Sequence, residues 1–129
     1  MFLHISHHAW NVDGSGSDRP PDPYVSWIQY WEHLTGLSRS GCSFKGCKRR
    51  AVHGGHIWIA YLGPVITPVC AECNSCENRT RMQDSWAFLR SGLKVIRVNC
   101  TEDMRRAPRR FATTMSSLSK CTCQCCRRT

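Results

Sequence analysis

The sequence lacks long hydrophobic runs and any signal-peptide pattern. Its start, MFLHISHHAW, has no basic segment followed by a sustained apolar stretch. No later segment approaches the roughly 20 apolar residues that a membrane-spanning helix needs. We therefore expect no membrane span and no secretory leader. A cytoplasmic or nuclear location, where thiols stay reduced, is the expectation that follows.

Cysteine is absent from residues 1–41, although the chain of 129 residues contains ten cysteines. Four of them are crowded into CTCQCC near the end. This uneven distribution favours metal binding over an evenly cross-linked secreted scaffold. If the chain is the mature form of a secreted precursor, disulfides are the alternative. A chain of this length builds a modest core, which a bound metal would help to stabilise.

Acidic residues are scarce, with nine Asp and Glu against 18 Lys and Arg, so the formal net charge is +9. Such an excess attracts polyanions. Much of it falls late in the chain, at Arg105, Arg106, Arg109, Arg110, Lys120, Arg127 and Arg128. We expect a nucleic-acid or acidic protein partner, the alternative being a solvated basic tail that binds nothing specific.

Composition divides the chain into three parts. Residues 11–23 are rich in Gly, Ser, Asp and Pro, which disfavour regular structure. Residues 1–22 are therefore predicted to form an N-terminal arm or extended wrap, with Trp10 docking on the body. Residues 23–100 are predicted to form a zinc-binding domain, and residues 101–129 an irregular, basic, cysteine-rich tail.

A helix is predicted in DPYVSWIQYWEHLTG. Asp22 is the candidate N-cap, Pro23 suits the first helical position, and Gly36 is a stop signal. Apolar side chains recur on one face, at Tyr24, Trp27, Ile28, Trp31 and Leu34. We interpret this face as core packing, and a base-stacking surface is the alternative.

A β-hairpin and a second helix are predicted next. The β-rich segments AVHGGHIWIAYL and VITPVC are separated by Gly63 and Pro64, which suggests paired strands. The segment NSCENRTRMQDSWAFL has no helix breaker and is predicted to be helical to near Gly92. A short strand, LKVIRV, is expected to follow.

Two cysteine pairs flank the predicted hairpin. Cys42 and Cys47 bracket SFKG, and Cys70 and Cys73 bracket AE, so both thiolates of each pair can face one ion. A hairpin would bring the pairs together, and four thiolates suit the tetrahedral preference of structural Zn²⁺. One zinc ion is predicted here.

The order of these features resembles a treble-clef zinc finger. The pattern C-x4-C, GGHI, P-V-C-x-x-C-N is similar to the zinc-bound version of the HNH (ββα-metal) endonuclease domain, over residues 42 to about 80. In that family a strand histidine activates water, and the residue after the second cysteine pair helps to hold a divalent metal. The resemblance implies His56 as general base and Asn74 as a metal-side residue.

This sequence departs from the family pattern. Gly55 stands where the family has an acidic or polar ligand, and the loop after His56 lacks the customary Asn. Glu72 and Glu77 are the nearby carboxylates, too few for a hard cation. A degenerate, non-cutting member is therefore favoured. His53 or His56 could instead replace a cysteine at zinc, or His56 could hydrogen-bond within the core.

The remaining cysteines carry open alternatives. Cys121, Cys123, Cys125 and Cys126 could form a second zinc cluster, a lipidation or redox patch, or part of a disordered tail. The basic neighbours would lower the thiol pKa values, which favours metal binding or oxidation, and we incline to a second metal site. Cys76 is expected to pack beside the zinc, and Cys100 to be a buried small residue.

These expectations combine into a single small α+β domain, a zinc-stapled treble clef with an aromatic-faced N-terminal helix. The first functional hypothesis is a non-catalytic zinc-binding module whose basic surface contacts nucleic acid or an acidic protein. The second is an HNH-like metal-dependent nuclease. The third is an effector-like interaction protein whose zinc is purely structural and whose arm and tail recognise the target.

Overall fold

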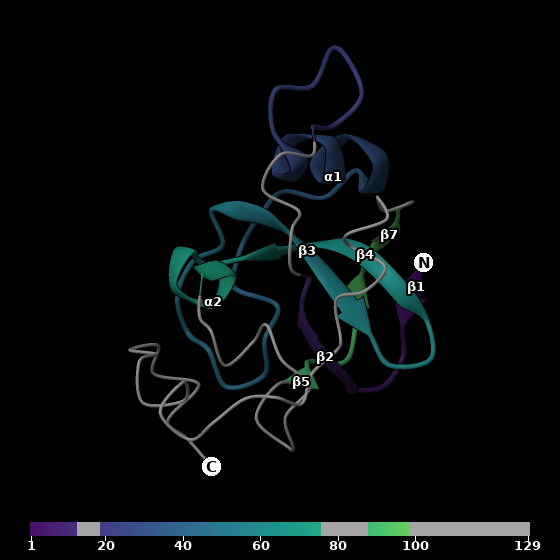
Figure 1. Cartoon of the computed structure of the whole chain (residues 1–129). Helices are drawn as coiled ribbons and strands as arrows, with labels where there is room; N and C mark the ends of the chain where they lie inside the picture. Colours follow the sequence, from purple (N-terminus) through teal and green to yellow (C-terminus); the bar gives the residue numbers. More distant parts are fainter. Residues whose placement is uncertain (13–18, 76–87, 99–129) are drawn as a thin grey trace.

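The computed structural model describes residues 1–12, 19–75 and 88–98 (Figure 1). The described part is α+β, with more strand than helix. Its elements are β1 (Phe2–Leu3), β2 (His7–Asn11), α1 (Trp27–Thr35), β3 (His53–Ile59), β4 (Gly63–Val69), α2 (Ala71–Ser75), β5 (Phe88–Leu89), β6 (Leu93–Lys94) and β7 (Ile96–Arg97).

Among these residues no helix is long and apolar enough to cross a membrane. The predicted tail at residues 101–129 lies outside the described residues.

The centre of the fold is the antiparallel hairpin of β3 and β4. Its register runs from His53 opposite Val69 to Ile59 opposite Gly63. The connection uses two left-handed residues, Tyr61 at φ 68° and Gly63 at φ 95°. Glycine adopts such a φ without steric cost, so Gly63 allows the chain to reverse direction tightly between β3 and β4. The predicted hairpin is confirmed.

Strand β2 lies inside the sheet, which corrects the prediction of an N-terminal arm for this segment. The five-stranded sheet has the order β5-β2-β3-β4-β7. Ala9, Trp10 and Asn11 pair with β3 and are all buried. A strand covered on both faces shows no alternation of apolar and polar residues, and this alternation is the pattern by which a strand is recognised in a sequence. Trp10 does pack on the body, as part of this strand.

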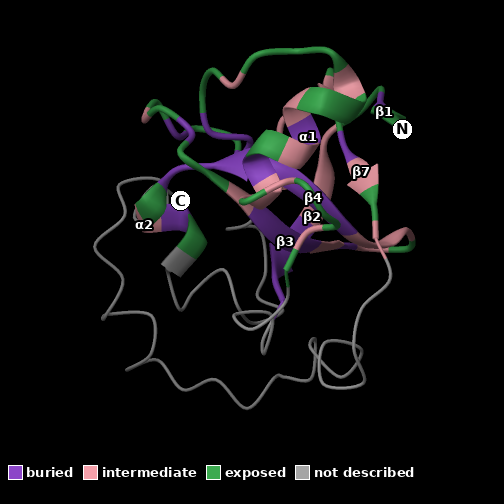
Figure 2. Cartoon of the chain, turned by 90° about the horizontal axis from the view of Figure 1, so that it is seen from above, coloured by how far each residue is buried: buried purple, intermediate pink, exposed green. Residues whose placement is uncertain are grey.

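The two faces of the hairpin have different partners. Alternate side chains of a strand point to opposite faces, and directly paired residues share a face. Ile57 and Val65 belong to the core cluster that includes the cysteines. His56 and Ile66 lie on the opposite face, which α1 covers (Figures 1 and 2).

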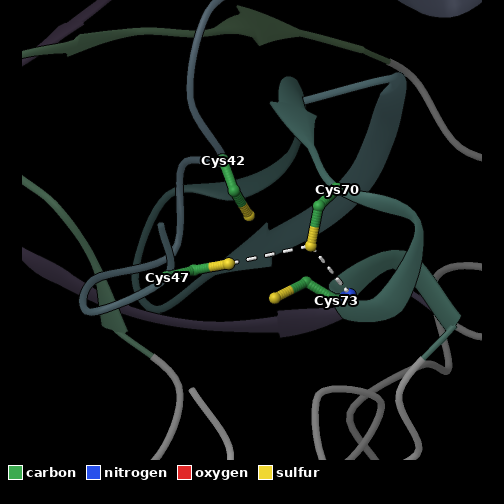
Figure 3. Close-up of side chains that lie close together, drawn as sticks. All are labelled: Cys42, Cys47, Cys70 and Cys73. Atoms are coloured by element: carbon green, nitrogen blue, oxygen red, sulfur yellow. Dashed lines mark hydrogen bonds between the residues drawn. The ribbon is translucent and has the colours of Figure 1, made fainter. Parts of the chain in front are cut away.

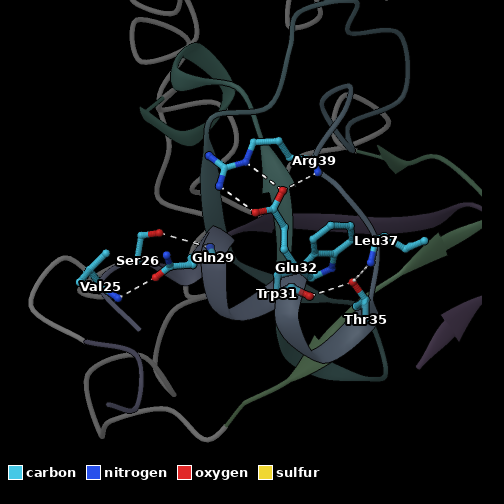
Figure 4. Close-up of polar contacts among 8 residues, drawn as sticks. All are labelled: Val25, Ser26, Gln29, Trp31, Glu32, Thr35, Leu37 and Arg39. Carbon is cyan, nitrogen blue, oxygen red and sulfur yellow. Dashed lines mark hydrogen bonds and ion pairs between the residues drawn. The ribbon is translucent and has the colours of Figure 1, made fainter. Parts of the chain in front are cut away.

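Helix α1 begins later than the sequence predicted. Its N-cap is Ser26, whose hydroxyl accepts a hydrogen bond from the Gln29 backbone N–H at 3.2 Å (Figure 4). The Gln29 side-chain carbonyl in turn accepts from Val25 N–H at 3.0 Å. This reciprocal arrangement is a variant of the capping box, and it places the start at Trp27 rather than Pro23. The helix ends at Gly36, as predicted, with φ 74°.

Only part of the predicted aromatic face of α1 is core. Ile28 and Trp31 are buried, and the Trp31 indole N–H donates to Lys94 O at 2.8 Å. Leu34 is 51% exposed, so its predicted burial is wrong. Tyr24 is not part of this face either, because it precedes the first residue of the helix, Trp27.

The segment after the second cysteine pair is described only at its ends. α2 covers Ala71–Ser75, and residues 76–87 lie outside the described residues. The predicted helix cannot reach Gly92, because Phe88 and Leu89 pair with β2. The expected strand LKVIRV is divided between two partners: Lys94 pairs with Phe2 of β1, and Ile96 with Ile66 of β4.

Candidate metal centre

The first cysteine pair is held by a tight turn. Cys47 N–H donates to Phe44 O at 3.1 Å, and Gly46 within this turn has φ 87°. A positive φ at the third residue is typical of a type II turn and favours glycine. Cys42 N–H donates to Arg49 O at 2.9 Å, which closes the loop. The CSFKGC spacing therefore folds back so that both thiols lie on its inner side (Figure 3).

The second cysteine pair lies where β4 leads into α2. Cys70 follows Val69, the last residue of β4, and Cys73 is in the first turn of the helix. The Cys73 backbone N–H donates to the Cys70 sulfur at 3.3 Å. Hydrogen bonds from backbone N–H groups favour the thiolate form that binds metal.

The four sulfur atoms converge in the core, as Figure 3 shows. All lie within 4.8 Å of one another, and Cys47 Sγ and Cys70 Sγ are 3.7 Å apart. Zn–S bonds of about 2.3 Å in a tetrahedron place sulfurs about 3.8 Å apart. Each cysteine is at most 4% exposed. Within the described ranges this is the one group of cysteine, histidine or carboxylate side chains close enough to share a metal ion.

The protonation of the cluster also suits a metal. A hydrogen bond with the Cys73 thiol, aided by backbone hydrogen bonds, lowers the pKa of Cys42 to about 6. Burial raises the pKa of Cys70. None of the four cysteines is in a disulfide. A buried group of thiols that cannot all ionise alone is stabilised by a divalent cation, which compensates their charge.

Two residues that sequence reasoning missed support the cluster from outside. The Arg90 guanidinium donates to the carbonyls of Cys42 and Cys47, the latter at 3.1 Å. The buried Asn11 amide donates to Cys73 O at 2.8 Å. Arg90 thus holds both cysteines of the first pair, and Asn11 holds Cys73 of the second. Both bind backbone carbonyls, which every residue carries, so no sequence pattern indicates these contacts.

His56 and Asn74, the predicted catalytic pair, both line one pocket of about 320 Å³ between α1 and β3. His56 is 7% exposed and packs edge-on against Trp27, with ring centroids 4.8 Å apart. It lies on the α1 face of β3, opposite the face that Ile57 shares with the cysteines. His56 is therefore not placed to replace a cysteine at the metal.

The space around the two glycines before His56 is closed. A Cβ on Gly54 would lie 2.6 Å from Ile28 N, and one on Gly55 would lie 2.8 Å from Val69 Cγ2. A side chain at Gly55, where the nuclease family has a ligand, would require the buried Val69 to shift. The described lining of the pocket contains Arg19, His53 and Asn74 but no carboxylate.

The other predicted site residues are placed as follows. His53 is exposed at the start of β3. Cys76, Cys100, Cys121, Cys123, Cys125 and Cys126 lie outside the described residues, so the predicted second metal site does too.

Comparison of the chain with family models, curated proteins and solved structures finds no match.

Proposed function

We propose that this chain is a non-catalytic zinc-binding module that contacts nucleic acid through the basic surface beside its metal site. The observation that carries the proposal is the convergence of four buried thiols from two parts of the chain within 4.8 Å. Four cysteine ligands fill the tetrahedral positions of zinc and leave none for water or substrate. Such a site stabilises structure and does not catalyse.

The order of the elements supports a treble-clef arrangement for this site. The Cys42–Cys47 loop comes first, the β3–β4 hairpin follows, and α2 supplies Cys73 from its first turn. The hairpin places Cys70 at its end, so the chain returns to the loop. In this arrangement the metal joins three elements that share a small core.

The basic surface, as we define it, consists of Lys45, Lys48 and Arg50, which are exposed on and beside the loop that carries the first cysteine pair. The adjacent Arg49 is 3.5 Å from a Glu72 carboxylate oxygen, so part of its charge is compensated. The other carboxylates of the described residues belong to Asp22 and Glu32. The loop therefore presents mainly positive charge, which suits phosphate contacts that position a nucleic acid without reading its sequence.

Salt-dependent binding tests the nucleic-acid part of the proposal. Fluorescence anisotropy with duplex and single-stranded DNA should show affinity that falls steeply between about 50 and 200 mM salt. Replacing Lys45, Lys48 and Arg50 together with Gln should reduce the salt slope by about 2 to 3. Lys94→Gln is the control, because it removes a positive charge from β6, outside the basic surface. Absence of salt-dependent binding would refute this role, and an unchanged slope in the triple variant would refute the basic surface as its site.

A second candidate function is an HNH-like nuclease that uses His56. The observation in its favour is that His56 and Asn74 line the same pocket. Against it, the described lining offers no carboxylate for a magnesium ion. Cleavage of plasmid DNA or RNA with magnesium or manganese, lost in His56→Ala and kept in His53→Ala, would establish it. An inactive wild type across a broad metal screen would exclude it.

A further inference from the structure

A second surface, distant in sequence from the metal-binding loop, contains a groove between the end of α1 and strands β1, β6 and β7. Figure 2 shows α1, β1 and β7 close together, and in Figure 1 β7 lies between the end of α1 and β1. The groove has a volume of about 580 Å³, within the roughly 300–1,000 Å³ range of binding pockets. Its lining is Met1, Phe2, Leu34, Thr35, Lys94, Val95, Ile96 and Arg97.

Large apolar side chains on the groove are exposed to solvent. Met1 is 47% exposed, Phe2 45% and Leu34 51%. Leu34 is on the last turn of α1, where several polar residues have a similar helix propensity, so helix formation does not require leucine there. Single exposed apolar residues are ordinary, but three that share one hollow are typical of an interaction site.

The charges at the groove are of one sign. Lys94 and Arg97 are exposed on neighbouring short strands, and no carboxylate belongs to the described lining. The Arg97 guanidinium donates to Leu62 O at 2.9 Å, which fixes its position while leaving it exposed. Two cations beside an apolar hollow complement a ligand that combines carboxylates with large apolar side chains.

The backbone beneath the groove is firmly held. Val95 N–H donates to Met1 O at 2.8 Å, and Trp31 donates to Lys94 O at 2.8 Å. The strands β6 and β7 are thereby tied to β1 and to α1. A preformed surface of this kind loses little conformational entropy when a ligand binds.

We propose that this groove binds an acidic amphipathic peptide segment of a partner protein, with large apolar side chains between Phe2 and Leu34 and carboxylates on Lys94 and Arg97. A second copy of this chain is a poorer occupant, because the net charge of +9 makes copies repel one another. This interaction goes beyond the proposed nucleic-acid role and uses different residues.

Fluorescence anisotropy on the full chain tests the proposal. The probe is a labelled synthetic peptide in which Leu and Phe repeat at helical spacing among Glu residues, an arrangement that fits a groove. A peptide with the same glutamates and with Ser in place of Leu and Phe controls for charge alone. The first peptide should bind and the second should bind at least about tenfold more weakly.

Three variants locate the binding site. Leu34→Gln, which keeps a good helix former, and Lys94→Glu should each weaken binding of the apolar peptide about tenfold or more. Lys45→Glu, a charge reversal on the basic surface, should leave it unchanged while weakening DNA binding. Circular dichroism is the measurement that checks whether each variant is folded.

Other results would overturn the proposal. Equal binding of both peptides, or equal weakening by Lys45→Glu, would indicate attraction of charge alone. Self-association in sedimentation that Leu34→Gln abolishes would assign the groove to a second copy. Binding to vesicles of anionic lipid, lost in Leu34→Gln while the peptide fails to bind, would assign it to a membrane surface. Loss of DNA binding in the basic-surface variants bears on the proposed function and leaves this test unaffected.

Discussion

Helix α1 packs tightly against strand β3 at Gly54. A Cβ at this position would be 2.6 Å from both Ile28 N and Trp27 C, which are backbone atoms and cannot rotate away. The glycine therefore sets the distance between the helix and the sheet, and with it the width of the pocket that His56 lines. Gly54, two residues before His56, therefore has a role in packing.

Replacing this glycine tests the close approach. Gly54→Ala should destabilise the fold by about 1–3 kcal/mol, because the helix must shift to admit the methyl group. Gly41→Ala is the matched control, since a Cβ there meets its nearest atom at 3.7 Å. The control should be neutral or slightly stabilising. Urea unfolding measures both changes, and equal stability of the two variants would disprove the packing argument.

At the residue scale, the sequence predicted the four cysteines of the cluster but not Arg90 and Asn11, which hydrogen-bond to their backbone carbonyls. A metal requires particular donor atoms, so the spacing of Cys42, Cys47, Cys70 and Cys73 is enough to indicate a metal site. Arg90 and Asn11 bind carbonyl groups instead. Their positions depend on strands that meet only in the folded chain. The same limit applies to Gly54, whose need for space arises from a distant helix.

At the scale of elements, α1 shows how local chemistry sets a boundary. The Ser26 hydroxyl accepts from the Gln29 N–H, so the helix starts at Trp27. Ser26→Ala should cost about 1 kcal/mol of stability because one backbone donor loses its partner. Ser38→Ala, an exposed serine beyond the helix, is the control. Thermal unfolding that shows no difference between the two variants would contradict the assigned cap.

The end of α1 is tied to the following loop by Glu32 and Arg39. The Glu32 carboxylate accepts from the Arg39 guanidinium at 2.9 Å and from its backbone N–H at 2.7 Å (Figure 4). Hydrogen bonds from Arg39 lower the pKa of Glu32 from 4.5 to about 2. The side chains are 26% and 38% exposed, so solvent screens the pair and limits its contribution to about 1 kcal/mol.

This pair predicts a pH dependence of stability. Because the folded-state pKa of Glu32 lies below 4.5, its contribution is fully present above pH 4.5 and is lost as pH falls toward 2. Glu32→Gln should therefore be less stable than wild type near neutral pH, and the difference should shrink through that window. Glu72→Gln, whose ion pair is longer at 3.5 Å, is the control. A difference that stays constant with pH in urea unfolding would contradict this account.

The sequence indicated elements well where a pattern was local. The hairpin was marked by Gly63 and by β-rich flanks, and Gly36 marked the end of α1. Strand β2 was hidden because Ala9, Trp10 and Asn11 are buried on both faces. The helix predicted after Cys73 extended too far, because Leu89 is buried by long-range contacts with β2 that override local preference.

At the scale of the whole molecule, the sheet separates two sites. The cysteine cluster lies on the face of Ile57 and Val65, and the His56 pocket lies on the face that α1 covers. This separation was not visible in the sequence, where GGHI and the cysteines form one continuous motif. The register of β3 decides it, since neighbouring residues of a strand point in opposite directions.

The proposed zinc ion is expected to contribute to stability as well as to local geometry. Cys42, Cys47, Cys70 and Cys73 belong to the same core cluster as Phe44, Ile57 and Leu89. Without a cation, four buried thiols would occupy the centre of this small core. Structural zinc sites supply about 10–16 kcal/mol of apparent binding free energy. We therefore expect a chelator to unfold the domain, with loss of near-ultraviolet circular dichroism, and added zinc to restore it.

Metal analysis of the purified chain tests the central claim most directly. Zinc content is measured for the wild type and for the double variant Cys47→Ser/Cys70→Ser, with and without residues 120–129. We predict that the double variant contains one zinc ion fewer than its parent, and that removing residues 120–129 leaves this difference unchanged. Equal zinc content in the parent and the double variant, or no zinc in either, would contradict the account.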